Sequence, residues 1–128
     1  MHPQITVVTI GVADLEQAKR FYADGLGCPI SQDHGLFVSF DLGGGSSLGV
    51  YARVTLAAEA GVDPAGSGFS GVTFHYLVET RTAVDDLLAR AEAAGGTVTA
   101  PAQDTQWGGY FGYFADPDGN LWKVATSA

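Results

Sequence analysis

Two residues in the second half of the chain have side chains that can bind an anion or move a proton. His75 lies in the stretch "VTFHYLV", and Lys123 lies in "DPDGNLWKVA". An imidazole can donate, accept or transfer a proton near neutral pH, whereas an ammonium only donates and carries a positive charge. Both stretches are rich in residues typical of strands. The chemistry available to the two side chains therefore depends on the strand faces that carry them.

Three roles are open to Lys123. Its stem can lie against aromatic rings while the ammonium reaches water, or the ammonium can pair with a carboxylate, phosphate or phenolate of a ligand. A desolvated lysine can also lose its proton and act as a base or nucleophile. His75 has similar alternatives, as a hydrogen-bonded wall residue or as a general base.

The elements that must position these residues occur twice in the chain. Residues 5–12 and 71–78 are strand-like, and an amphipathic helical segment that ends at glycines follows each. Asp14 and Thr82 are the predicted N-caps of these helices. Later strand-like stretches are "LFVSFDL" and "SLGVYAR" in the first half, and "GTVTAPA", "YFGYFAD" and "NLWKVAT" in the second.

This internal repeat predicts the organisation of the chain. Each half is roughly βαβββ, so we expect modules 5–52 and 71–126, joined by a linker 53–70 within a single domain 1–128. One module alone is too short to close a core, because a small unit buries too little of its surface.

Composition limits the class of partner and the compartment. Six basic residues against 14 acidic ones, a net charge of −8, argue against a nucleic-acid partner. No apolar run reaches the roughly 20 residues that span a bilayer, and the N-terminal residues do not resemble a secretory signal. Cys28 is the single cysteine and cannot form an internal disulfide. We expect a cytoplasmic protein with no membrane partner.

The stretches "TIGVADLEQAKRFYADGLG" and "GGYFGYFADPDGNLWKVA" are similar to the vicinal oxygen chelate superfamily. This superfamily includes glyoxalase I, extradiol dioxygenases, and fosfomycin- and bleomycin-resistance proteins. The resemblance covers nearly the whole chain. It implies an α+β fold in which two βαβββ modules form a curled mixed sheet, a cup that binds ligands on its concave face. It also implies a homodimer.

The resemblance implies a metal site as well, made in the metalloenzymes by a His near the start of each module and a Glu in each last strand. The corresponding positions of this chain are Val7, Gly49, Thr73 and Lys123. None of these side chains suits a divalent cation, so we expect no metal and no other cofactor. His75 could bind a metal only with ligands from elsewhere, such as Asp104 or His34.

Strand alternation predicts which side chains face the cup and which pack under the helix. In the first strand of the second module, the face expected under the helix comprises Val72, Phe74, Tyr76 and Val78. The predicted ligand-binding residues are Thr9, Ser39, Tyr51, His75, Trp107, Phe111, Tyr113 and Lys123.

These residues predict a metal-free protein that sequesters or carries an aromatic or drug-like small molecule, as in the bleomycin-resistance branch. The alternative is a metal-free enzyme of isomerase, cyclase or lyase type. In that enzyme His75 and Lys123 are the catalytic residues and transfer a proton, with Tyr113 as a hydrogen-bond donor. A glyoxalase-like metalloenzyme fits less well, because the four ligand positions have changed.

Overall fold

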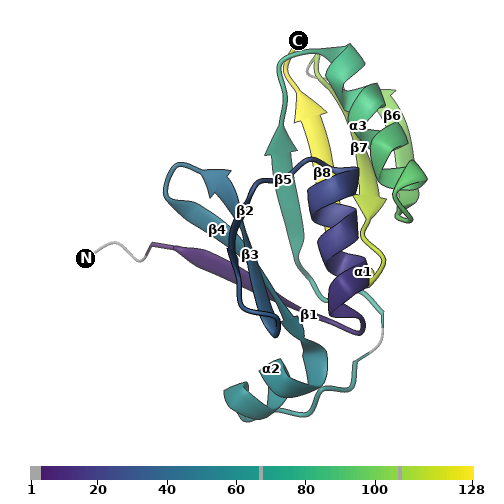
Figure 1. Cartoon of the computed structure of the whole chain (residues 1–128). Coiled ribbons are helices and arrows are strands. Elements are labelled where there is room, and N and C mark those ends of the chain that lie inside the picture. Colours follow the sequence, from purple (N-terminus) through teal and green to yellow (C-terminus); the bar gives the residue numbers. More distant parts are fainter. Residues whose placement is uncertain (1–3, 67, 107) are drawn as a thin grey trace. The chain divides into compact units, whose positions relative to one another are not determined.

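The computed structural model describes residues 4–66, 68–106 and 108–128 (Figure 1). The chain divides into two compact units, Met1–Ser67 and Gly68–Ala128. Each unit contains a four-stranded mixed sheet and a helix between its first two strands. The predicted α+β class with two βαβββ modules is therefore confirmed. Within the described ranges, none of the helices combines the length and hydropathy required to cross a bilayer.

The first unit begins with a strand and a short helix. Its elements are β1 (Val7–Val12), α1 (Leu15–Lys19), the π-helix η1 (Arg20–Gly25), β2 (Ile30–Asp33), β3 (Phe37–Gly43), β4 (Ser46–Ala52) and α2 (Arg53–Ala60). The strand order is β1-β4-β3-β2, with β1 parallel to β4 and the other pairs antiparallel. Strand β2 was not predicted individually, because all four of its residues are exposed and give no apolar alternation.

The predicted cap of the first helix is confirmed. The Asp14 carboxylate accepts a hydrogen bond from the backbone N–H of Gln17 at 3.1 Å. This satisfies one of the donors that a helix start leaves unpaired. Phe21 and Tyr22 at the end of the helix are fully buried, and the Tyr22 ring lies 5.7 Å from that of Phe40 on β3. These aromatic contacts attach the helical segment to the first sheet.

The second unit repeats this plan. Its elements are β5 (Thr73–Leu77), α3 (Arg81–Ala93), β6 (Thr97–Asp104), β7 (Tyr110–Ala115) and β8 (Leu121–Thr126). The strand order is β5-β8-β7-β6, with β5 parallel to β8. The two sheets thus have the same topology, as the internal repeat predicts.

Helix α3 begins two residues earlier than the sequence predicted. Thr80, not Thr82, is the N-cap: its backbone is extended, and its Oγ1 accepts from the N–H of Ala83 at 3.0 Å. One face of α3 buries Leu88 against the sheet, where a Cβ added to Gly112 would lie only 2.6 Å from Leu88 Cδ1. A side chain at position 112 would therefore displace Leu88 and press on the backbone of β6 at Ala100 and Ala102.

The prediction that Val72, Phe74, Tyr76 and Val78 all pack under the helix is wrong for two of them. Val72 is 53% exposed and Tyr76 is 42% exposed. The reason is that β5 is an edge strand, whereas α3 packs on β6, β7 and β8 (Figure 1). Phe74 is half-buried because its ring lies 5.0 Å from that of Trp122 on β8. Alternation identified the face but not how far the helix extends over it.

The acidic turn between β7 and β8 is organised by one buried carboxylate. Asp116 Oδ1 accepts from the backbone N–H groups of Asp118 and Asn120, and Oδ2 accepts from the Asn120 side chain. Gly119 has a φ of 85°, which a residue with a Cβ rarely adopts. The Asp116 carboxylate therefore holds the turn that leads into β8.

Candidate functional site

Strand pairing in the second unit brings three of the predicted site residues into one row. His75 on β5 is the register partner of Lys123 on β8, and Lys123 is in turn the partner of Tyr113 on β7. Their neighbours Trp122, Val124 and Phe114 are buried on the other face, toward α3. The row therefore lies on the face opposite the helix. We call the surface formed by His75, Phe111, Tyr113 and Lys123 the Lys123 face.

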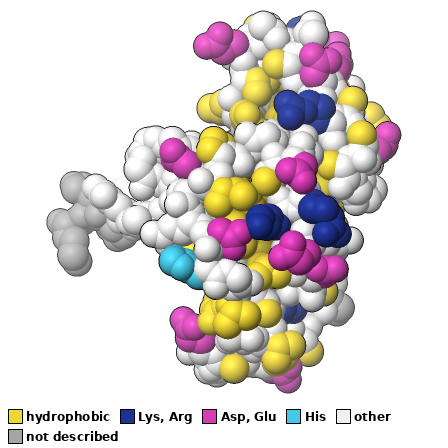
Figure 2. Space-filling model, viewed as in Figure 1, with side chains coloured by type: hydrophobic (Ala, Val, Ile, Leu, Met, Phe, Trp, Pro, Cys, Tyr) yellow, Lys and Arg dark blue, Asp and Glu magenta, His cyan; other side chains and the backbone are white. Residues whose placement is uncertain are grey.

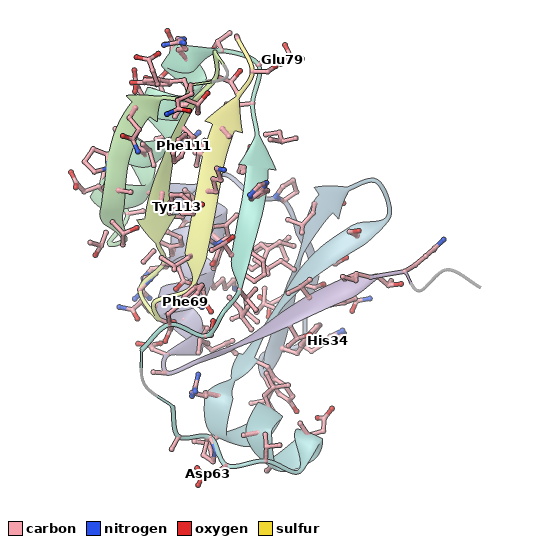
Figure 3. All side chains as sticks on the ribbon, turned by 180° about the vertical axis from the view of Figure 1, so that it is seen from behind. His34, Asp63, Phe69, Glu79, Phe111 and Tyr113 are labelled. Atoms are coloured by element: carbon pink, nitrogen blue, oxygen red, sulfur yellow. The ribbon has the colours of Figure 1, made fainter. Side chains whose placement is uncertain are left out.

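Two aromatic rings hold the Lys123 ammonium on this face. Nζ lies 4.8 Å from the ring centroid of Phe111 and 6.0 Å from that of Tyr113. Both residues come from β7 (Figure 3), and their rings meet edge to face, with centroids 6.1 Å apart and planes at 87°. Ring faces are electron-rich, so they attract a cation and orient the flexible side chain. Lys123 is thus half-buried on apolar surface, with its ammonium at a defined place.

The described residues supply no countercharge to this ammonium. Within the ranges 4–66, 68–106 and 108–128, no Asp or Glu oxygen lies within ion-pair distance of Lys123 Nζ. A bound anion would therefore not have to displace a carboxylate of these residues.

In the equivalent row of the first unit, an aromatic ring fills the space that the Lys123 side chain occupies in the second unit. Gly49 pairs with Thr9 on β1 and with Ser39 on β3, so it occupies the position that Lys123 occupies in the second sheet. A Cβ on Gly49 would lie 2.8 Å from Phe37 Cε1 and 2.9 Å from Thr9 Oγ1. The Phe37 ring, which packs edge to face with Tyr51 at 6.1 Å, fills the space that a side chain at 49 would need.

The predicted binding residues thus fall into two groups. The first-unit group is Thr9, Ser39 and Tyr51, and the second-unit group is His75, Phe111, Tyr113 and Lys123. Ser39 is only 5% exposed, and its Oγ is 2.7 Å from Ser31 Oγ, so it has a hydrogen-bond partner within its own sheet. Trp107 lies outside the described residues.

The residues at the metal positions of the superfamily do not fit a divalent cation. Such a cation needs several N, O or S ligands. The side chains of Val7 and Gly49 offer none, and Thr73 offers one exposed hydroxyl. Lys123 places a positive charge at the fourth position, which repels a metal. No metal-dependent step can be derived from this set.

Other metal ligands are not gathered nearby either. The described residues contain no group of three or more His, Cys, Asp or Glu side chains arranged to hold an ion. Asp104, considered above as a partner for His75, forms an ion pair with Arg81 instead. The ion pair with Arg81 therefore gives Asp104 a structural role at the end of β6, without any metal.

Sequence reasoning missed the polar cluster to which Asp104 belongs. The Arg81 guanidinium lies over the Tyr110 ring, 5.0 Å from its centroid, and the Tyr110 hydroxyl donates to Asp85 Oδ1 at 2.7 Å. This hydrogen bond to the carboxylate raises the pKa of Tyr110 above its ordinary value of 10.0. The cluster joins the start of α3 to β6 and β7. It could not be predicted because its members are far apart in sequence, and each one taken alone is typical of a surface residue.

Comparisons with known proteins agree with this architecture. Residues 4–124 match the model of the Glyoxalase/Bleomycin resistance protein/Dioxygenase superfamily. A glyoxalase-related enzyme from Fulvimarina pelagi is 32% identical, with a TM-score of 0.88 over 96% of this chain and 87% of that one. A glyoxalase/bleomycin resistance protein/dioxygenase from Nocardioides is 26% identical, with a TM-score of 0.78 over 98% of this chain and 84% of that one.

Curated sequence relatives match a smaller part of the chain. An uncharacterized protein of Mycobacterium bovis is 39% identical over 61 residues, which are 48% of this chain and 38% of that protein. The chain therefore matches well under half the length of such relatives.

Proposed function

Because the chain belongs to the Glyoxalase/Bleomycin resistance protein/Dioxygenase superfamily but lacks side chains suited to its metal, we propose metal-free binding of a small organic molecule. The site is the Lys123 face. One observation carries the proposal: an ammonium rests on the rings of Phe111 and Tyr113, and no described carboxylate pairs with it. The ligand is sequestered or carried rather than transformed.

The chemistry of the Lys123 face supports this function. Small-molecule sites are mostly apolar and aromatic, with a few polar groups that orient the ligand. Phe111 and Tyr113 provide two ring surfaces, while Lys123, His75 and the Tyr113 hydroxyl provide hydrogen-bonding groups. Acidic and basic side chains are interspersed over the molecular face shown in Figure 2. That pattern, with the net charge of −8, does not favour a nucleic acid.

A screen of the metal-depleted protein tests the proposal. We expect aromatic fragments to bind in the presence of EDTA, as observed by saturation-transfer NMR, and Phe111→Ala to abolish this binding. Tyr76→Ala is the matched control, because it removes an exposed aromatic side chain from the other face of the same sheet. Binding that required a divalent cation, or that survived Phe111→Ala, would contradict a metal-free site on the Lys123 face.

A second candidate function is proton transfer on the bound molecule. One observation favours it: the register places His75, a possible general base, directly opposite Lys123. If this function is correct, a bound fragment with an acidic C–H should exchange that hydrogen for deuterium faster with the wild type than with His75→Ala. Equal exchange rates would leave binding as the function.

We also propose that the protein forms a homodimer. Several large apolar side chains are exposed on the described surface, including Val54 at 70% and Phe69 at 69%. Exposed apolar surface is typical of protein–protein contacts. Sedimentation equilibrium should give twice the chain mass of 13.3 kDa. The chain mass itself would refute the dimer.

A further inference from the structure

We infer that the ligand of the Lys123 face is an organic carboxylate: one carboxylate group on a body of one or two aromatic rings. The carboxylate binds Lys123 Nζ, and the rings pack against Phe111 and Tyr113. This inference rests on the proposed function and adds the chemical class of the ligand.

Charge is the first argument. The chain has 14 acidic residues against six basic ones, and two of its cations are already paired: Lys19 Nζ lies 2.6 Å from Asp33 Oδ2, and Arg81 pairs with Asp104. Arg20, Arg53 and Arg90 likewise have no ion pair among the described residues, but all three are exposed. Lys123 differs because its side chain is half-buried against two aromatic rings, where water solvates an unpaired charge less well. Its contacts with rings are weaker than a charge-assisted hydrogen bond, and they leave its N–H donors available.

The position of His75 is the second argument. Neighbouring strands lie about 4.8 Å apart, and His75 and Lys123, paired across β5 and β8, project from the same face. Lys123 Nζ lies toward the β7 rings, so a ligand group between the two side chains would meet the ammonium on one side and the imidazole on the other. A neutral imidazole has one N–H donor, and an ammonium has three. A carboxylate has two oxygens and can accept from both side chains at once. An amide or alcohol can also accept hydrogen bonds but brings no negative charge.

The number of donors argues for a carboxylate over a phosphate. Phosphate sites usually combine Arg forks, several cations or the backbone N–H groups of a helix start. The Lys123 face has one ammonium and one imidazole, and α3 lies on the opposite face of the sheet. This donor set matches a single negative charge.

The rings determine the size of the ligand. The row from His75 through Lys123 to Tyr113 crosses three adjacent strands and is therefore about 10 Å wide. The edge-to-face pair of Phe111 and Tyr113 presents an apolar wall beside the ammonium. An aromatic acid of one or two rings covers this area.

Isothermal titration calorimetry with two matched probes tests the inference. The probes are 1-naphthoate and the uncharged 1-naphthamide, which have the same rings, titrated into metal-depleted wild type. We expect naphthoate to bind about tenfold more tightly or better, since a hydrogen bond to a charged group exceeds a neutral one by about this factor. Lys123→Met should remove the preference, and Lys123→Arg should retain it.

Two further variants separate local from general effects. His75→Ala should weaken naphthoate binding several-fold with little effect on naphthamide. Arg90→Gln removes one positive charge from the exposed surface of α3 and should leave both affinities unchanged. Each variant is first shown to be folded by circular dichroism, and Lys123→Gln replaces Lys123→Met if the latter is unfolded.

The outcomes distinguish the inference from the function on which it rests. Equal affinities for the two probes in wild type, or a preference for naphthoate that persists without the lysine charge, would overturn the carboxylate and leave an uncharged aromatic site. If neither probe bound, the aromatic site itself would be contradicted. Loss of the preference in Arg90→Gln would indicate a general charge effect and would also overturn the inference.

Discussion

A single methyl group added to the first sheet should destabilise the protein through two identifiable contacts, of which the one with Phe37 can be removed by substitution. In Gly49→Ala, the new Cβ would lie 2.8 Å from Phe37 Cε1 and 2.9 Å from Thr9 Oγ1. Carbon atoms pack best at about 3.5–4.0 Å, so the Phe37 ring must move by about 1 Å. The substitution probes whether position 49 has room for any side chain, including a metal-binding glutamate.

The expected cost is the difference between two opposing effects. Overpacking of this kind costs about 1–3 kcal/mol. Alanine in a strand gains about 0.5–1 kcal/mol over glycine, because it loses less conformational freedom on folding. We therefore expect the free energy of unfolding to fall by about 1–2 kcal/mol. In a Phe37→Leu background the ring is absent and only the contact with Thr9 Oγ1 remains, so the same methyl should cost less.

Urea denaturation of four proteins measures this coupling. The wild type, Gly49→Ala, Phe37→Leu and the double variant are compared by circular dichroism, and the coupling energy should be about 1 kcal/mol or more. Two results would refute the reasoning. Gly49→Ala as stable as wild type would mean that the site has room, and an equal cost in both backgrounds would mean that Phe37 is not the obstacle.

Three other predictions concern local interactions. Thr80→Ala should lower the free energy of unfolding by about 1 kcal/mol in urea denaturation, whereas Thr82→Ala should change it little, because only Thr80 caps α3. The hydrogen bond and ion pair with Lys19 lower the pKa of Asp33 below its ordinary 3.8. The contribution of this carboxylate to the free energy of unfolding is therefore present near neutral pH and lost as pH falls through the folded-state pKa. Asp33→Asn should be less stable than wild type at neutral pH and equally stable in strong acid. In an NMR titration, Asp85→Asn should return the raised pKa of Tyr110 toward 10.0, and an unchanged value would exclude the hydrogen bond as its cause.

The rows of the two sheets could be predicted because strand geometry repeats every two residues. A shift of 74 residues aligns the last strands of the two halves: Phe37 with Phe111, Ser39 with Tyr113 and Gly49 with Lys123. Strand pairing places Gly49 and Lys123, and likewise Ser39 and Tyr113, at equivalent positions of the two sheets. In the last strand, alternation places Trp122 and Val124 on the face opposite Lys123, and both side chains are buried. Periodicity identifies the faces because it depends only on the backbone, whereas the partner of each residue across the sheet comes from the strand pairing.

Alternation could not predict the side-chain conformations on each face, or how much of the sheet the helix covers. Nothing in the alternation indicates that Phe37 fills the space beside Gly49, whereas the aligned Phe111 lies beneath an ammonium. Exposure of Tyr76 depends on where α3 crosses the sheet, which is set by packing between distant elements. The cluster around Arg81 depends on contacts between residues far apart in sequence.

The central claim is that the Lys123 face binds an organic molecule without a metal. Its most direct test is an amide NMR titration of the metal-depleted protein with 1-naphthoate in EDTA, repeated with excess Zn²⁺ in place of EDTA. We predict chemical-shift changes centred on β7 and β8 near Tyr113 and Lys123, with the same affinity in both conditions. Shift changes that occurred only with Zn²⁺, or that centred on other strands, would contradict the claim.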